Sequence, residues 1–184
     1  MITVSVDTME LDRLRKLLRG IPGGMRKACD AGVKEGAKAV KSAISSEVPR
    51  QYNVKASRVK RAVTVKGGKS QGIVLVRGQR MNLIEFHVSP RRVKNPQHGL
   101  TVSVRKDTGM KRLMHGFLMR GGGGKTIVME RIGRGRKAIR SLSSLAVPQM
   151  MSHPAVEERI SEDVSRAVIE GMRIFAGRIL TGGK

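Results

Sequence analysis

Two long apolar stripes at helical spacing, one in each half of the chain, constrain the fold of this 184-residue sequence most strongly. Apolar side chains that recur every three or four residues lie on one face of an α-helix. The first stripe predicts a helix that ends near Glu47, before Pro49, and the second predicts a helix with Pro154 in its first turn, capped by Ser152 or His153. The first stripe comprises Met25, Cys29, Val33, Ala37, Val40, Ile44 and Val48, and the second comprises Val156, Ile160, Val164, Val168, Met172, Phe175 and Ile179.

The first of these helices also contains many small residues. Pro22 suits its first turn, and Gly32 and Gly36 lie in its interior. A glycine in a helix interior costs about 1 kcal/mol relative to alanine. Such a cost is expected where a side chain would prevent close packing, so we predict that another helix or a sheet approaches this face closely. The accompanying small residues are Ala28, Ala31, Ala39 and Ala43.

The segment before the long helix predicts two short elements. The alternation of residues 2–6 is typical of a strand, and residues 9–18 place their leucines on one face of a helix. Asp7 or Thr8 is expected to cap this helix, and Gly20 is expected to end it. The single cysteine, Cys29, excludes a disulfide within the chain and is expected to fill space in the core.

The middle of the chain predicts strands. A short basic helix over residues 54–62 precedes segments in which apolar and polar residues alternate. These segments follow one another without intervening helices, which favours an antiparallel sheet. The predicted strands cover residues 62–66, 72–77, 82–88, 100–106, 116–120 and 125–132. The side chains expected to face the core are Val63, Val65, Ile73, Leu75, Val102 and Val104.

Together these patterns predict one α+β domain over residues 1–184. A mostly antiparallel sheet is expected to be packed by the long helix of the N-terminal half and by the C-terminal helix. Basic loops and a glycine-rich hairpin are expected to extend from it. The expected loops cover residues 89–99, 105–115, 119–126 and 131–146.

The stretch MRGGGGKTIV, residues 119–128, has the composition of a phosphate-binding loop. The P-loop pattern requires a glycine where this chain has Met119, and it requires a helix directly after the loop. Residues 126–129 predict a strand instead. We therefore interpret the stretch as a hairpin with a candidate assembly loop at its tip, and a nucleotide-binding enzyme is the weaker alternative. The tip comprises Gly121, Gly122, Gly123, Gly124 and Lys125.

The sequence contains no residue pattern that indicates catalysis. It has no Gly-x-Ser-x-Gly motif, and its histidines lack the spacing of metal ligands. The histidines are His87, His98, His115 and His153. The acidic residues of the middle segment are isolated, and we interpret them as ion-pair partners of neighbouring cations. They are Glu85, Asp107 and Glu130. We therefore predict a non-enzymatic protein without a metal or another cofactor.

The positive charge is concentrated in the middle of the chain. The whole chain has 37 Lys and Arg residues against 14 Asp and Glu residues, a formal net charge of +23. Residues 48–150 hold 23 of those cations and only three of the acidic residues. Such a field attracts nucleic acid, acidic protein surfaces or anionic membranes. Because the chain has three Phe, one Tyr and no Trp, contacts to the phosphate backbone are favoured over base stacking.

Two basic loops supply the candidate contacts to DNA or to a protein partner. They contain Arg91, Arg92 and Lys94 within residues 89–99, and Arg134, Arg136 and Lys137 within residues 131–140. One possible function is therefore a stand-alone nucleic-acid-binding module that contacts phosphates without sequence specificity. The charge is equally compatible with solubility or with an acidic partner. No apolar run is long enough to span a membrane, so we expect a soluble protein made in a cytoplasm.

Three fragments suggest a second possible function. They are RMNLIEF at residues 80–86 with SPRR just after it, GFLMR at residues 116–120, and IRSLSSLAVPQM at residues 139–150. Together with the long Ala/Gly/Lys-rich helix and the YNV that follows it, they resemble the minor tail protein Z family, the tail-completion proteins of long-tailed phages. The most telling run is Val147, Pro148, Gln149 and Met150. The chain departs from the family at residues 143–146, which read SSLA where a Phe-Gly-Pro stretch is usual.

The resemblance implies an α+β virion protein that completes the head-proximal end of the tail and joins it to the head-to-tail connector. Related neck proteins form six-fold rings around the DNA channel. The implied partners are other copies of the chain, the neighbouring tail terminator, tail-tube or head-completion proteins, and packaged double-stranded DNA. A closed ring requires a heterologous interface. The small-residue helix or the C-terminal helix is a candidate for that interface, and the alternative is that both stripes form the core of the monomer.

Overall fold

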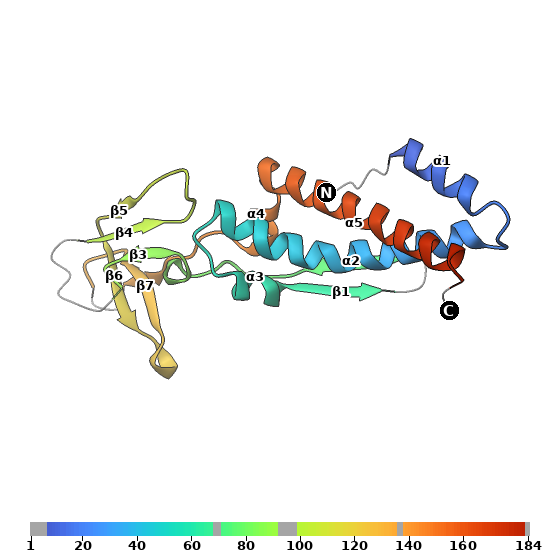
Figure 1. Cartoon of the computed structure of the whole chain (residues 1–184). Helices are drawn as coiled ribbons and strands as arrows, with labels where there is room; N and C mark the ends of the chain where they lie inside the picture. Colours follow the sequence, from blue (N-terminus) through green and yellow to red (C-terminus); the bar gives the residue numbers. More distant parts are fainter. Residues whose placement is uncertain (1–6, 68–70, 92–98, 136–137, 183–184) are drawn as a thin grey trace.

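The computed structural model describes residues 7–67, 71–91, 99–135 and 138–182. Two long helices lie side by side, with a short helix at one end of the pair and most of the strands beyond the other end (Figure 1). The helices are α1 (Thr8–Leu17), α2 (Gly24–Gln51), α3 (Ala56–Ala62), α4 (Val147–Met151) and α5 (Pro154–Leu180). This architecture confirms the predicted α+β class and both long helices.

The strands of the described residues form three small antiparallel sheets. The first contains β1 (Val63–Gly67) and β2 (Gly72–Val76), the second contains β3 (His87–Ser89), β4 (Leu100–Ser103) and β5 (Lys111–Leu113), and the third contains β6 (Gly116–Arg120), β7 (Thr126–Arg131) and β8 (Ile139–Ser141). The first sheet packs along α2, whereas the other two lie beyond the end of the helix pair (Figure 1). The antiparallel pairing is as predicted, but it is divided among three sheets.

The two long helices approach each other closely at glycines of α2. A Cβ atom built on Gly32 would lie 2.5 Å from Met172 Cγ and 2.8 Å from the carbonyl oxygen of Val168. A Cβ atom built on Gly36 would lie 2.5 Å from Val168 Cγ2. Because these distances are shorter than van der Waals contact, only glycine permits this separation of the helices. The predicted close approach to the small-residue face is therefore confirmed.

Helix α1 caps one end of this pair. Asp7 Oδ1 accepts a hydrogen bond of 2.9 Å from the Met9 amide, so Asp7 is the N-cap, in agreement with the sequence. Leu14 and Leu18 are buried in a small cluster with Met172 and with alanines of both long helices. Cys29 packs against the same cluster as a partly buried side chain, as expected of a core filler. The strand predicted for residues 2–6 lies outside the described residues.

The predicted ends of α2 were wrong by a few residues. Pro22 precedes the helix, which begins at Gly24 after Gly23 with a φ of 65°. At the other end the helix continues through Pro49 to Gln51. Proline removes one backbone hydrogen bond from the last turn. The turn persists because Val48 and Tyr52 on either side are buried in the main core, and the Tyr52 amide still donates to the Val48 carbonyl oxygen at 2.9 Å.

The strand predicted for residues 82–88 is mostly another structure. Residues Leu83–Glu85 form a short 3-10 helix, and only His87–Ser89 form a strand, β3. The side chain of Asn82 caps the 3-10 helix, since its Oδ1 accepts a hydrogen bond of 3.1 Å from the Ile84 amide. An asparagine that bonds to the backbone two residues later favours a turn over a strand.

Two strands lie in segments that were predicted as loops. Strand β5 lies within residues 105–115 and β8 within residues 131–146. Both are edge strands of three residues, too short to show a clear alternation. In β8 the pairing places Arg140 directly opposite Glu130, and their side chains form an ion pair with an Nη2–Oε2 distance of 2.7 Å. Such a cross-strand charge pair helps to hold an edge strand.

The predicted core-facing side of β2 was also wrong. Val63 pairs with Val76 and Val65 pairs with Val74, so these four side chains share one face. Val63, Val74 and Val76 on that face pack against the main core and Val65 lines a groove along α2, whereas Ile73 points outward with 53% of its surface exposed. The run GIVLV is apolar throughout, so alternation alone does not select a face. Val63 and Val102 are buried, in agreement with the sequence.

The main core joins the long helices to the strand-rich end. Its fully buried side chains come from α2, α3, α4, α5, β7 and the segment before β3. They include Ile44, Val48, Phe86, Val128, Met150, Val156 and Ile160. The apolar stripe predicted for α5 therefore faces the main core along the first half of the helix, at Val156, Ile160 and Val164.

A candidate polyanion-binding surface

The two predicted basic clusters are only partly covered by the described residues. Arg91 lies next to its loop and donates a hydrogen bond of 3.0 Å from Nη2 to the Phe86 carbonyl oxygen. Arg134 is exposed between β7 and β8. The other members, Arg92, Lys94, Arg136 and Lys137, lie outside the described residues. The structure therefore provides the position of one cation from each cluster.

A different group of cations surrounds a pocket that was not predicted. The pocket has a volume of about 300 Å³ and lies between the C-terminal part of α3 and the segment after β2. Four arginines line it: Arg58, Arg61, Arg77 and Arg80. The buried side chains of Met81 and Val147 also line it, so the arginines surround an apolar floor that belongs to the main core.

The backbone around this pocket is fixed by the first sheet and by the core. The Arg77 amide donates a hydrogen bond of 2.9 Å to the Ala62 carbonyl oxygen, which joins the end of β2 to the end of α3. Val59 of α3 is fully buried, and the Met81 carbonyl oxygen accepts a hydrogen bond of 2.8 Å from the Ser144 amide. The positions from which the four arginines project are therefore well determined, although the arginines themselves are exposed.

A second polar pocket continues the basic surface. It has a volume of about 350 Å³, and its lining includes Lys55, Arg91 and Lys106. Glu85 also lines this pocket, and its Oε1 lies 3.8 Å from Nη2 of Arg58 in the first pocket. The two pockets are thus neighbours on one surface, and Glu85 is the one carboxylate in the described lining of the two.

The three acidic residues of the middle segment are ion-pair partners, as predicted. Glu85 pairs with Arg58, Glu130 pairs with Arg140, and Asp107 pairs with Arg105. The hydrogen bonds from the Arg105 guanidinium are the main cause that lowers the pKa of Asp107 below its ordinary value. Each of these carboxylates therefore has an arginine as its structural partner.

The glycine-rich stretch forms the predicted hairpin. Strands β6 and β7 pair from Gly116 opposite Glu130 to Arg120 opposite Thr126, and the glycines close the turn between them. The Gly121 amide donates a hydrogen bond of 2.8 Å to the Lys125 carbonyl oxygen, and Gly123 and Gly124 adopt positive φ angles of 78° and 75°. A strand follows the glycines where a P-loop requires a helix N-terminus. The hairpin projects from the strand-rich end of the molecule (Figure 1).

The run that is most telling for the phage family forms α4. Val147 and Met150 are buried in the main core, and Gln149 Oε1 accepts a hydrogen bond of 3.0 Å from the Ala146 amide. Pro148 lies beside Gly78 at the edge of the arginine pocket. The motif therefore positions the core and one wall of this pocket.

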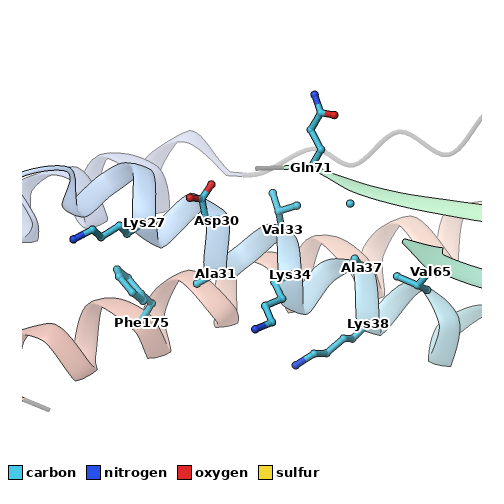
Figure 2. A pocket seen from close by; sticks show the side chains of 11 residues that line it. Lys27, Asp30, Ala31, Val33, Lys34, Ala37, Lys38, Val65, Gln71 and Phe175 are labelled. Carbon is cyan, nitrogen blue, oxygen red and sulfur yellow. The ribbon is translucent and has the colours of Figure 1, made fainter. Parts of the chain in front are cut away.

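An open groove lies along α2. It has a volume of about 670 Å³, and its apolar floor includes Val33 and Ala37 of α2 and Val65 of β1. Figure 2 shows Lys34 and Lys38 on the same helix and Phe175 contributed by α5. The groove presents an apolar strip of the small-residue helix between cationic side chains.

Within the described ranges, no group of three or more His, Cys, Asp or Glu side chains is arranged to hold a metal ion. His153, the N-cap of α5, stacks edge-on against Tyr52 with 6.2 Å between the ring centroids, and its buried Nδ1 has no hydrogen-bond partner among these residues. None of the helices in the described part of the chain has the length and apolar character of a membrane span.

Comparisons with known proteins gave no relative: no family model, no curated protein and no solved structure matches this chain. The resemblance to the tail-completion family therefore depends on the sequence fragments themselves.

The arginine pocket was missed because its members are far apart in the sequence. The basic helix at residues 54–62 was recognised, but Arg77 and Arg80 were not connected with it. The predicted strands 62–66 and 72–77 contain the missing signal. When they pair as a hairpin, the residue before β1 lies opposite the residue after β2, here Ala62 opposite Arg77, which brings the end of the basic helix with Arg61 next to Arg77.

Proposed function

We propose that this chain is a non-enzymatic structural protein of the phage neck or tail. It completes the head-proximal end of the tail and joins it to the head-to-tail connector as an oligomeric ring around the DNA channel. The proposal is supported by the three sequence fragments and by one structural observation. The molecule is elongated (Figure 1), and the elements at each of its ends carry exposed apolar side chains.

The two apolar ends belong to different elements. At the helical end, Leu17 and Leu180 are more than half exposed at the last turns of α1 and α5. At the strand-rich end, Met110 and Met114 flank β5, and Ile132 follows β7; Met114 has 68% of its surface exposed. Exposed apolar groups of this kind are typical of surfaces that become buried in assemblies.

Because the two ends differ, contacts between them are heterologous. A heterologous contact generates a closed ring when the rotation between subunits closes and a filament when it does not. A six-fold ring, as the resemblance implies, is one closed solution. The surplus charge of residues 48–150 then has two uses, toward packaged DNA and toward acidic surfaces of neighbouring tail terminator, tail-tube or head-completion proteins.

The decisive experiment is mass spectrometry of phage particles purified from a host that carries the gene. The copy number of the chain is counted against the major tail-tube protein. A handful of copies per particle, as one ring requires, supports the proposal. Absence of the chain from particles contradicts it.

A variant pair tests the interface itself. Met114→Glu and Leu180→Glu each place a charge on one apolar end and are expected to abolish self-association in analytical ultracentrifugation. Ile73→Glu, on the exposed face of the first sheet, which packs along α2 between the two ends, is the matched control. Equal loss of association in all three variants contradicts the assignment of the interface to the ends.

The second candidate function is a stand-alone module that binds nucleic-acid phosphates. The continuous basic surface across the two polar pockets favours it. This function predicts tight duplex binding by a chain that is absent from particles, so the same mass-spectrometry measurement separates the two candidates.

A further inference from the structure

We propose that the pocket formed by Arg58, Arg61, Arg77 and Arg80 binds one phosphodiester group of a nucleic-acid backbone. The proposal concerns these four residues and does not depend on a virion role. It assigns the binding to a defined pocket instead of to the charge of the whole surface.

The arrangement of the arginines is the first argument. Arg58 and Arg61 are three residues apart on one face of α3, and Arg77 and Arg80 lie on the segment that follows β2. The hydrogen bond between the Arg77 amide and the Ala62 carbonyl oxygen holds these two segments together. Arginines from two segments therefore face one small volume from two sides, as a tetrahedral anion with several acceptor oxygens requires.

The balance of charge is the second argument. Within the part of the chain that the structure describes, the nearest carboxylate is Glu85, at 3.8 Å from Arg58. Arg61 uses its Nε in a hydrogen bond of 3.4 Å to the Ser57 carbonyl oxygen, which leaves its two terminal amino groups available. Four cations around one pocket repel each other, and a bound anion removes that repulsion. Arginine is the side chain best suited to bidentate contacts with phosphate.

The size and lining of the pocket select the class of ligand. A volume of about 300 Å³ accommodates a phosphate with part of its sugar, at the lower limit of the sites that hold small molecules. Its described lining contains no aromatic side chain on which a base could stack. These features fit recognition of the backbone without reading of the bases.

The surroundings allow a polymer to continue beyond the pocket. The neighbouring polar pocket, linked through Glu85, adds Lys55, Arg91 and Lys106 on the same surface. A strand held at one phosphate by the four arginines therefore meets further cations along its path. An acidic protein segment also carries anions, but duplex DNA carries about one negative charge per 1.7 Å of its axis, and that density better matches a surface on which seven cations surround one carboxylate.

The test compares two double variants of equal charge change. Arg77→Gln with Arg80→Gln removes half of the pocket, and Arg120→Gln with Lys125→Gln removes two exposed cations from the hairpin. Binding to a fluorescein-labelled duplex is measured by anisotropy between about 50 and 200 mM salt. Loss of one phosphate contact is expected to lower the log–log salt slope by about 1 and the affinity by about tenfold. The hairpin variant is expected to change both quantities by less.

Inorganic phosphate and sulfate provide an independent readout. Each is expected to raise the Tm of the parent chain and of the hairpin variant above the value in chloride at the same ionic strength, because a ligand that binds only the folded state stabilises it. The pocket variant is expected to lose this difference. Arg77→Lys with Arg80→Lys keeps the charge and loses the bidentate fork, so it is expected to keep the salt slope and bind more weakly.

Two outcomes overturn the proposal. Equal losses in the pocket and hairpin variants mean that the charge acts diffusely. Binding of a poly-glutamate peptide that depends on Arg77 and Arg80, without binding of duplex, means that the pocket is a contact for an acidic protein. Neither outcome changes the count of copies in phage particles, so this proposal and the proposed function fail separately.

Discussion

The helical end and the strand-rich end of this molecule differ in how their elements pack and in how their charges are balanced. The long helices pack by shape, since Gly32 and Gly36 of α2 admit Val168 and Met172 of α5 into direct contact. Their charges are nearly balanced: residues 1–47 have nine basic and six acidic residues, and residues 151–184 have five of each. Many of their ion pairs join residues three apart on the same helix, such as Lys38 with Glu35 at 2.7 Å.

The strand-rich end has short strands and a large surplus of cations. Its sheets contain strands of three to six residues, and every one of its three carboxylates is already paired with an arginine. Net charge of one sign destabilises a compact state through repulsion. The helical end is therefore nearly balanced in charge, whereas the strand-rich end carries a net charge that opposes its compact state.

The largest expected effect is at the side chain that connects the two regions. Phe86 is fully buried and packs in the core shared by α2, α5 and the strands. Phe86→Ala is expected to lower the free energy of unfolding by about 3–5 kcal/mol, because it removes a large buried side chain and leaves a cavity. Urea unfolding followed by circular dichroism measures the change.

Hydrogen exchange on the same variant sharpens the comparison. We expect the amides of β3, β4 and β7 to lose protection in Phe86→Ala. Amides of α2 and α5 near Gly32 are expected to keep their protection. Uniform loss of protection across the chain means that both regions unfold as one unit. That result would remove the distinction in stability between them.

The second effect tests the shape of the helix contact. Gly32→Leu is expected to cost about 2–3 kcal/mol, because its side chain has no space beside Met172 and Val168. Gly177→Ala is the matched control on α5, since no atom lies within 4 Å of the added Cβ. The control is expected to stabilise the chain by about 1 kcal/mol through helix propensity alone. Thermal unfolding of both variants measures the difference, and a neutral Gly32→Leu contradicts the close packing.

These two regions also differ in how much of them could be predicted from the sequence. The long helices were predicted because the apolar residues of each repeat within a single segment. The small residues of α2 also predicted its close packing, because they lie within the same segment. The ends of the helices were less certain, because the burial of Val48 and Tyr52 that carries α2 past Pro49 is a tertiary effect.

For the middle of the chain, residues 48–150, the sequence predicted the strands and the basic charge, but only part of the detailed structure. The apolar run of β2 does not distinguish Ile73 from Val74, and the face is decided by pairing with β1. The basic loops were recognised from local charge. The arginine pocket forms only because residues 58–61 and 77–80 lie close together in the fold, and a local sequence pattern does not show which distant segments meet. The hairpin with glycines at its tip was predicted because both strands and the turn are contiguous.

The third effect concerns one polar side chain that joins the strands. Asn82 Oδ1 accepts hydrogen bonds from the amides of Ile84 and Val128, at 3.1 and 2.9 Å, and its Nδ2 donates to the Val128 carbonyl oxygen at 3.1 Å. Asn82→Ala leaves these partly buried backbone groups without partners. It is therefore expected to cost about 2 kcal/mol, within the range for unsatisfied buried polar groups. Asn82→Asp keeps the acceptors and loses the donor, so a smaller loss in urea unfolding is expected, and equal losses contradict this assignment.

The smallest effect is the dependence on pH of one exposed ion pair. Arg105 Nε donates a hydrogen bond of 3.0 Å to Asp107 Oδ1, and this contact lowers the pKa of the carboxyl group below its ordinary value of 3.8. A carboxyl group with a lower pKa in the folded state stabilises the fold above the unfolded-state pKa, and the contribution disappears as the pH falls through the folded-state pKa. Asp107→Asn should therefore be slightly less stable than the parent near neutral pH, and the difference should vanish in acid below 3.8.

A double-mutant cycle with Arg105→Gln isolates this pair. The stability of the double variant should equal that of either single variant at neutral pH, since each single change already removes the interaction. Urea unfolding at neutral and acidic pH supplies the measurement. A difference between Asp107→Asn and the parent that stays constant between these conditions would show that the carboxylate charge contributes nothing. The strand-rich end would then bear its surplus of cations without help from this pair.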